Sequence, residues 1–228
     1  SGNDEYNEVS ITGRSDVNMV VVVNFTNRQV LLVSIPRDYY VEFPDITNGS
    51  RDKLTHAGIY GMDVLTSSVE ELLDVNIDYY VRVNFTSVVD IIDAIGGLAF
   101  YNPYPFGTTY YDYYFDEGEV WVDGWQALQY ARERKSLPDG DFARGQHQQI
   151  IIEAMINKLV SAASLANYTA LMDAIDSCAI TDMPKDLIKK IVRLQLNEGG
   201  SWNVLKAQVY GTEDFKPSYA SGGMELSV

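Results

Sequence analysis

The sequence predicts an α/β fold built in layers, because strand-like segments alternate along the chain with segments of helical periodicity. Val-rich or apolar runs at 17–25 and 30–35 are typical of strands, whereas apolar residues recur at helical spacing over 61–73 and 141–163. Strands that alternate with helices favour a sheet covered by helices. With 228 residues, 46% of them hydrophobic, the chain can form one sizeable domain or two small ones.

The first two strands are expected to form a hairpin through a turn at 26–29, and Pro36 ends the second strand. Both faces should be covered, since the two runs hardly alternate with polar residues. The next expected elements are a helix over 61–73, a strand over 79–85, a helix that is capped by Thr86 and ends at 95, and a strand over 98–101. An aromatic loop follows over 101–119, and Asp123 and Gly124 open a short helix. The last expected elements are a helix over 141–163 capped by Asp141, a helix over 186–196 and a strand over 204–210.

The net charge argues against a nucleic-acid partner, and the short apolar runs exclude a membrane-spanning helix within this sequence. The net charge is −15, which repels nucleic acid because phosphate neutralisation by Lys and Arg supplies most non-specific affinity. We therefore expect no nucleic-acid partner, and a phosphate ligand would need a local basic cluster. The apolar runs are also far shorter than the ~18 residues that a membrane-spanning helix requires.

Four arginines form the candidate basic cluster. Arg37 follows a strand directly, and Pro36 would fix the backbone that aims it. Arg132 and Arg134 would point the same way if residues 130–134 were extended, and an anion between them would relieve their repulsion. Arg144 falls in the first turn of a helix, where a cation is unfavourable unless an anion binds there. The alternatives are an ordinary exposed arginine and pairing with nearby acidic residues (Glu133, Asp139, Asp141).

Two carboxylates and one glutamine extend this hypothesis. Asp4 and Asp16 flank a polar stretch, and together they could hold Mg²⁺, which prefers oxygen ligands and substrate phosphates. Arg14 is close enough to join them. Gln148 lies one turn beyond Arg144, and the helix then becomes apolar, a pattern that suits a phospholipid-like substrate but also any helix packed on a core.

Common catalytic signatures are absent from the sequence. The two histidines, His56 and His147, have no second His or Cys beside them to suggest zinc. The chain also lacks the G-x-S-x-G motif, the phosphate-binding P-loop and the G-x-G-x-x-G motif after a strand. What remains is chemistry done by arginines, carboxylates and a metal.

An ordered set of short motifs resembles the LytR-CpsA-Psr family. Each motif is weakly specific alone, but the order along the chain is specific. The motifs are GRSD at 13–16, SIPRD at 34–38, DKLTHA at 52–57, VDIIDAIGG at 89–97, DG at 123–124 followed by AL at 127–128 and YAR at 130–132, and DGDFAR at 139–144 followed by QQ at 148–149.

The resemblance implies a single α/β domain over 1–228, with a central mixed sheet flanked by helices and a hydrophobic groove for a polyprenyl chain. The family motifs would occupy 1–165, and C-terminal helices and a strand would occupy 166–228. The implied enzyme works on the outer face of a bacterial membrane, anchored by an N-terminal helix upstream of this chain. It transfers teichoic acid, capsule or a similar polymer from polyprenyl pyrophosphate to peptidoglycan, with formation of a phosphodiester.

The same resemblance assigns roles to individual residues. Those that would bind and activate the pyrophosphate are Arg37, Arg132, Arg134, Asp141 and Arg144, with Arg14, Asp38, Lys53 and Gln148 as further substrate-binding candidates and Asp4 and Asp16 as ligands to Mg²⁺ or Mn²⁺. Two other functions stay open: hydrolysis of polyprenyl-pyrophosphate lipids at the same site, and non-catalytic binding of polyprenyl phosphates by a regulator.

Overall fold

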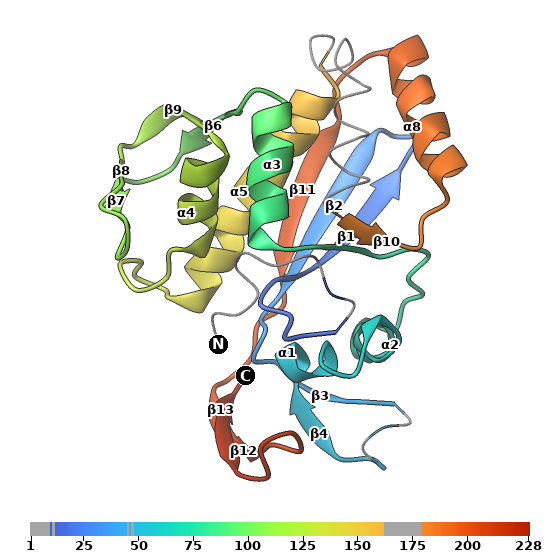
Figure 1. Cartoon of the computed structure of the whole chain (residues 1–228), viewed down its shortest axis with the longest axis vertical. Coiled ribbons are helices and arrows are strands. Elements are labelled where there is room, and N and C mark those ends of the chain that lie inside the picture. Colours follow the sequence, from blue (N-terminus) through green and yellow to red (C-terminus); the bar gives the residue numbers. More distant parts are fainter. Residues whose placement is uncertain (1–9, 11, 45, 47, 162–178) are drawn as a thin grey trace.

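The computed structural model, which describes residues 10, 12–44, 46, 48–161 and 179–228, has a mixed three-stranded sheet at its centre (Figure 1). Strand β1 (Asn18–Asn24) pairs antiparallel with β2 (Gln29–Ile35). Strand β11 (Asn203–Gln208) pairs parallel with β2, so the order is β1-β2-β11. The α/β class and the hairpin are confirmed, and β11 lies within two residues of the strand expected near the C-terminus.

Helix α5 (Asp141–Leu159) covers one face of this sheet. The buried Gln149 lies on its sheet-facing side, and its Nε2 donates to the main-chain oxygens of Leu32 on β2 (3.3 Å) and Ala207 on β11 (2.5 Å). A polar side chain buried in this way is tolerated because its hydrogen bonds are made. The contact fixes the position of α5 relative to the middle of β2 and to β11.

Strand β1 does not follow the expectation that both faces of the hairpin are covered. Its valines at 21, 22 and 23 are exposed by 48%, 52% and 43%, although successive side chains point to opposite faces of a strand. The expectation is therefore wrong at β1, which is an edge strand of the sheet.

A second layer packs on α5 and holds one of the two hydrophobic cores. It contains α3 (Phe85–Ala94), α4 (Gly124–Arg132) and the antiparallel pair of β6 (Leu98–Asn102) and β9 (Gly118–Val122). Gly124 is required where α4 meets α3, because a Cβ there would lie 2.4 Å from the oxygen of Val89. The cap of α3 is Asn84 rather than Thr86: its Oδ1 accepts from the Ser87 amide at 2.7 Å.

The aromatic segment at 101–119 is not a loop but part of a two-stranded ribbon over residues 98–122, which we call the aromatic ribbon. Beyond the β6–β9 pair, β7 (Phe106–Gly107) pairs with β8 (Tyr114–Phe115). Asn102 joins the two pairs, since its Nδ2 donates to the oxygens of Tyr104 (2.7 Å) and Asp116 (2.8 Å). The Tyr130 hydroxyl donates to its Oδ1 at 3.0 Å, which ties the ribbon to α4.

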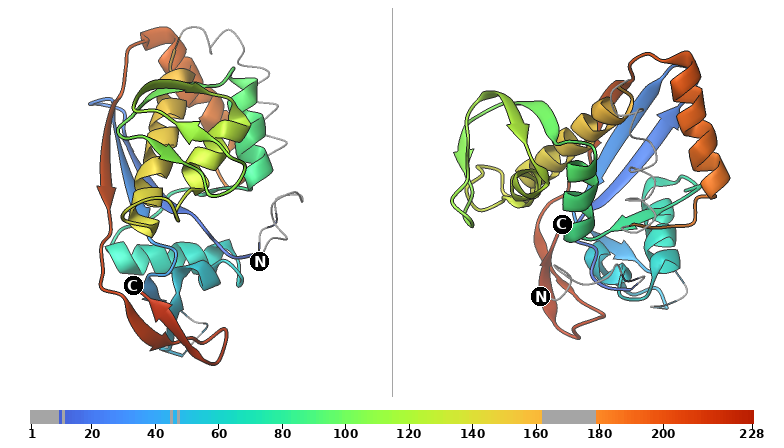
Figure 2. Two further views of the ribbon diagram at one scale, coloured as in Figure 1. Left: turned by 90° about the vertical axis from the view of Figure 1, so that its left-hand side faces the viewer. Right: turned by 45° about the horizontal axis from the view of Figure 1, so that its top comes forward.

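The opposite part of the molecule holds the second core. It is formed by β3 (Tyr40–Glu42), β4 (Arg51–Lys53), α1 (Leu54–Ala57) and α2 (Met62–Leu73), next to the C-terminal hairpin of β12 (Asp214–Pro217) and β13 (Met224–Ser227) (Figure 2). The buried Asp52 connects these parts. Its carboxylate accepts from the amides of Lys53 and Ala220 (both 2.7 Å) and the Ser218 hydroxyl (3.1 Å), and it pairs with His56 Nδ1 (2.9 Å).

The C-terminal region contains more strands than expected. Besides β11 and the hairpin, it supplies β10 (Ala179–Thr181), which pairs with β5 (Val81–Val83), and the helix α8 (Lys185–Glu198). The expected C-terminal helices and single strand are thus one helix and four strands within 179–228, while 166–178 lie outside the described residues. Within the described ranges, no helix combines the length and apolar character needed to span a bilayer.

Glu133 organises the turn between α4 and α5. This carboxylate is only 5% exposed and accepts four hydrogen bonds: from Thr109 N (2.6 Å) and Oγ1 (2.9 Å) in the ribbon, and from the amides of Arg134 (2.9 Å) and Ser136 (3.0 Å). Burial raises its pKa, but these bonds outweigh burial and lower the pKa of Glu133 to about 2. The folded state therefore stabilises the charged form.

We expect Glu133→Gln to lower the free energy of unfolding at pH 7 by about 3 kcal/mol, because a lowered carboxyl pKa is a stability contribution of ~1.4 kcal/mol per unit. This contribution is present above the ordinary pKa of 4.5 and is lost as the pH falls towards about 2. Urea denaturation of both proteins between pH 7 and pH 3 measures it, with Glu117→Gln in the exposed part of the ribbon as the control. If the difference in unfolding free energy between the unmodified and Glu133→Gln proteins does not shrink as the pH falls, the charged form of Glu133 is not what stabilises the fold.

We expect Asp52→Asn to destabilise the fold by ~2–4 kcal/mol, since the amide nitrogen would replace an acceptor that faces several donors. The C-terminal hairpin should also become accessible first, because Ala220 and Ser218 lose their partner. Urea denaturation and hydrogen exchange at 214–227 measure these effects. Asp78→Asn, a change at an exposed carboxylate, is the control; equal effects of the two substitutions would show that Asp52 does not hold the hairpin.

Candidate functional site

Arg37 lies immediately after β2, held by carboxylates on two sides. Its Nη1 is 2.7 Å from Asp16 Oδ1, and its Nε is 3.3 Å from Asp38 Oδ2. Its main-chain oxygen accepts from the Thr55 amide at 2.8 Å, which fixes the backbone beyond Pro36. Burial lowers the pKa of Arg37, but the Asp16 hydrogen bond and the charges of Asp38 and Asp16 outweigh burial. The net effect is a raised pKa, so the guanidinium stays charged.

The segment that carries Asp16 is held against α1. The Gly13 amide donates to the oxygen of Gly58 (2.9 Å), and the Ser15 amide donates to the oxygen of Thr55 (3.1 Å). Gly58 allows this approach, because a Cβ there would lie 2.5 Å from the Gly13 oxygen. The GRSD motif therefore brings Asp16 to Arg37 through main-chain contacts.

The first turn of α5 places one carboxylate between two arginines. Asp141 Oδ1 lies 2.8 Å from Arg144 Nη2 and 3.7 Å from Arg134 Nη1. The expectation that Asp141 caps the helix is wrong: the cap is Gly140, with φ of 53° and no side chain to bond the helix amides. Because Asp141 is the first helical residue instead, its carboxylate faces the arginines.

Arg144 shows that these charges share one environment. Its side chain is only 13% exposed, and burial is the main factor that lowers its pKa. Asp141 opposes the shift, whereas the positive charges of Arg37 and Arg134 add to it. Guanidinium groups from the end of β2, the turn after α4 and the start of α5 thus lie close enough to repel one another.

Arg132 does not lie as expected. It is the last residue of α4, so residues 130–134 are not an extended run; the helix ends there, and the C-cap residue Glu133 has extended backbone angles. The Arg132 guanidinium carbon lies 4.5 Å from the centroid of the Phe85 ring on α3. Arg132 and Arg134 therefore belong to different local environments on either side of Glu133.

A pocket of about 410 Å³ opens beside the arginines. The sequence-based candidates Asp38, Arg134 and Asp141 line it. Sequence reasoning missed the rest of the lining, most of all its C-terminal part; those residues are Pro36, Lys135, Leu137, Pro138, Gly140, Phe142, Glu213, Leu226, Ser227 and Val228. No local sequence pattern marks the C-terminal tail as part of the site. The tail reaches the pocket through a contact between distant residues: the Val228 amide donates to the main-chain oxygen of Asp38 (2.9 Å).

The further substrate-binding candidates take different positions. Lys53 Nζ is held 3.2 Å from both Asp38 Oδ1 and Glu225 Oε2, so it supports Asp38 and thereby Arg37. Gln148 Nε2 donates to the oxygen of Ala131 (3.4 Å), a contact between α5 and the end of α4. Arg14 is exposed beside Asp16 in the GRSD segment.

Of the two predicted metal ligands, Asp16 precedes β1, and Asp4 lies outside the described residues. Among the residues that are described, no three acidic, His or Cys side chains form a metal-binding group. Asp16 is 46% exposed, and Arg37 pairs with only one of its oxygens. This donor fits Mg²⁺, which commonly uses one or two carboxylates and completes its shell with water and substrate phosphates.

Comparisons with known proteins identify relatives of this chain. The chain is 37% identical over 180 residues to the polyisoprenyl-teichoic acid–peptidoglycan teichoic acid transferase TagU of Enterococcus faecalis, covering 78% of this chain and 58% of that protein. It is 39% identical over 175 residues to the protein of the same name from Bacillus mycoides, covering 76% and 56%. The chain therefore spans somewhat more than half the length of these relatives.

Solved structures show the same fold. The crystal structure of B. subtilis TagV matches with a TM-score of 0.79 at 29% identity, over 98% of this chain and 86% of that one. A structure of TagT bound to LIIa-WTA matches with a TM-score of 0.70 at 28% identity, over 88% and 75%. The family model for LytR-CpsA-Psr matches residues 1–224. This chain belongs to the LytR-CpsA-Psr family.

Proposed function

We propose that this protein transfers a glycopolymer from a polyprenyl-pyrophosphate carrier to a hydroxyl group of peptidoglycan. The observation that carries the proposal is that Arg37, Arg134 and Arg144, each from a different segment, come together around Asp141, which lines a pocket with Arg134. The relatives are named as transferases of teichoic acid from a polyisoprenyl carrier to peptidoglycan, which supports the same class of donor and acceptor.

The charges of the site suit a pyrophosphate. Three guanidinium groups are balanced by three carboxylates, Asp16, Asp38 and Asp141, so the cluster is close to neutral inside a chain of net charge −15. Guanidinium groups bind phosphate oxygens through parallel hydrogen bonds. A bound pyrophosphate would relieve the repulsion among the arginines, which otherwise destabilises the folded protein.

The proposed reaction is a direct phosphoryl transfer. The acceptor hydroxyl oxygen attacks the phosphorus that carries the glycopolymer, the new P–O bond forms a phosphodiester, and polyprenyl phosphate leaves. Asp141 lines the pocket and can take the hydroxyl proton, or it can act by orienting Arg134 and Arg144. Such transfers depend mainly on positioning and on neutralising spread negative charge, which the arginines supply. Mg²⁺ or Mn²⁺ bound through Asp16, and through Asp4 as predicted, would add positive charge on the phosphates.

The exposed apolar side chains of the sheet suit the polyprenyl chain. Val21 and Val23 share one face of β1, and further exposed apolar residues lie on β5 (Val81, Val83) and α8 (Leu194, Leu196). In Figure 1, α8 and the β5–β10 pair stand on the side where β1 is the sheet edge. Contiguous exposed apolar surface commonly marks a binding groove. We propose that the predicted lipid groove lies here.

The proposed setting is the outer face of a bacterial cell membrane. The donor is a membrane lipid and the acceptor is part of the wall, so the catalytic domain would work between them. An anchoring helix N-terminal to this chain, as predicted from the family resemblance, would keep the groove close to the lipid. The arginine cluster would recognise the phosphates of the lipid carrier, whichever polymer the carrier holds.

We expect Arg134→Ala and Arg144→Ala each to lower the transfer rate by at least ~10³-fold, as loss of a phosphate-binding arginine does in other phosphoryl transfers. Arg51→Ala, at an exposed arginine on β4, should keep the rate of the unmodified protein. The assay follows labelled glycopolymer from its lipid carrier to purified peptidoglycan, and urea denaturation verifies folding. A folded Arg144→Ala protein with full activity would contradict the proposal.

The same assay separates the competing functions. Product that forms without peptidoglycan would indicate hydrolysis, and binding of the lipid without turnover in Mg²⁺ would indicate a non-catalytic regulator. Arg132→Ala tests the arginine that lies apart from the cluster. We expect it to abolish transfer, with the fold retained, if Arg132 reaches the substrate from its position over Phe85.

A further inference from the structure

The aromatic ribbon, formed by β6, β7, β8 and β9 over residues 98–122, has two different faces. Its inner face is buried against α4 and α5 and includes Phe100, Phe106 and Phe115. The pairings Ala99↔Trp121, Tyr101↔Glu119 and Gly107↔Tyr114 define the outer face. That face exposes three aromatic side chains in a row: Trp121 by 63%, Tyr101 by 56% and Tyr114 by 65%.

Two of these rings lie along the ribbon because a glycine is beside them. A Cβ on Gly97 would be 2.6 Å from the Trp121 ring, so the indole packs directly over that backbone. The Tyr114 ring lies against Gly107, 3.6 Å from where a Cβ would be. Packing of this kind leaves one broad ring face open to solvent. Such a face is apolar and carries partial negative charge, so it attracts the C–H groups of a sugar ring.

The charge of this region narrows the class of ligand. Between Arg82 and Arg132 the sequence has no Lys or Arg but seven acidic residues, among them Asp112, Asp116, Glu117 and Glu119 in the ribbon, all four exposed. A polyanionic polymer, a nucleic acid or an anionic membrane would be repelled. A glycan with little charge would not be, and its hydroxyl groups can donate hydrogen bonds to the carboxylates.

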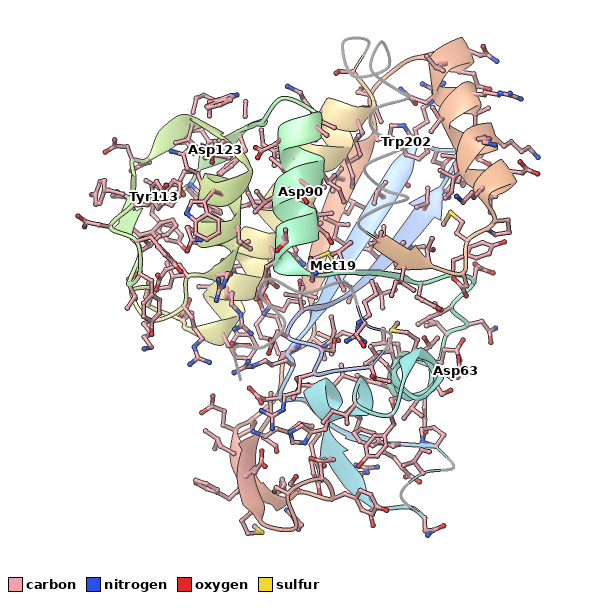
Figure 3. The ribbon with its side chains drawn as sticks, in the orientation of Figure 1. Met19, Asp63, Asp90, Tyr113, Asp123 and Trp202 are labelled. Carbon is pink, nitrogen blue, oxygen red and sulfur yellow. The ribbon has the colours of Figure 1, made fainter. Side chains whose placement is uncertain are left out.

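The ribbon adjoins the pocket of the proposed active site. Lys135 lines that pocket, and its Nζ donates to the Tyr110 hydroxyl at 2.9 Å. The same Nζ lies 5.1 Å from the centroid of the Tyr110 ring, which is itself exposed by 61%. Figure 3 labels Tyr113 in this ribbon, on the side of the molecule away from α8 and the proposed lipid groove. A polymer could therefore extend from the pocket across the ribbon without meeting the lipid.

We propose that the outer face of the aromatic ribbon binds a glycan strand of the acceptor, whose sugar rings stack on Trp121, Tyr101 and Tyr114. This identification of the glycan as the acceptor depends on the proposed transferase function. The negative charge of the ribbon favours the acceptor over the phosphate-containing donor polymer. Donor and acceptor would then approach the arginines from opposite sides.

The test is sedimentation of the protein with purified peptidoglycan sacculi that have been stripped of teichoic acid, without any lipid donor. We expect the triple variant Tyr101→Ala, Tyr114→Ala, Trp121→Ala to bind at least 10-fold more weakly than the unmodified protein. Phe215→Ala is the matched control, because Phe215 is also exposed by 63% but lies on β12. Chitohexaose, a soluble glycan without peptide, should compete with the sacculi.

The outcomes separate this inference from the proposed function. Equal binding by the triple variant and the Phe215→Ala protein would overturn the inference, as would competition by free stem peptide but not by chitohexaose. Ribbon-dependent self-association seen by light scattering, or ribbon-dependent binding to phosphatidylglycerol vesicles, would also overturn it. Loss of sacculus binding in the triple variant supports it even if no transfer is detected, in which case only the transferase proposal fails.

Discussion

The arrangement of the site depends on the ion pairing of Asp141 with Arg144 and Arg134. Three guanidinium groups that repel one another are held near a pocket. The guanidinium of Arg144 is mostly buried and therefore requires nearby negative charge. Asp141 and Asp16 supply it from α5 and from the GRSD segment. Together with Asp38, which also pairs with Arg37, these carboxylates balance the three positive charges, so the site is close to neutral in an otherwise acidic protein.

The surrounding fold holds these charges in place through contacts outside the arginine cluster. Gly140 caps α5 without a side chain, which leaves the Asp141 carboxylate free for the arginines. Glu133 takes four hydrogen bonds in the turn before α5 and joins that turn to the aromatic ribbon through Thr109. Asp52 connects the strand before α1 to the C-terminal hairpin, whose last residues line the pocket. The pocket is thus built by three regions that lie far apart in the sequence.

The distribution of exposed apolar and aromatic residues gives the molecule two different sides. Valines and leucines are exposed at β1, β5 and α8, whereas tyrosines and a tryptophan are exposed on the ribbon across α5 from them (Figures 1 and 3). Aliphatic surface suits a hydrocarbon chain, and flat aromatic rings with nearby carboxylates suit sugars. The arginines lie where the ends of β2 and α5 meet, between the two surfaces. This separation would let a lipid-linked donor and a wall polymer reach the same phosphorus.

The sequence by itself determined the α/β class, the β1–β2 hairpin, the long helix α5 and the candidates Arg37, Arg134, Arg144 and Asp141, because strand and helix periodicity and local motifs are short-range properties. It did not determine the position of Arg132. That residue is the last of helix α4, and whether it lies inside or just beyond the helix changes where its side chain points. Nor did it show the exposed valines of β1, which depend on what packs over an edge strand. The pocket residues Glu213 and Val228, the role of Glu133 and the one-sided aromatic ribbon were decided only by tertiary structure, because each arises from contacts between distant segments or from strand register.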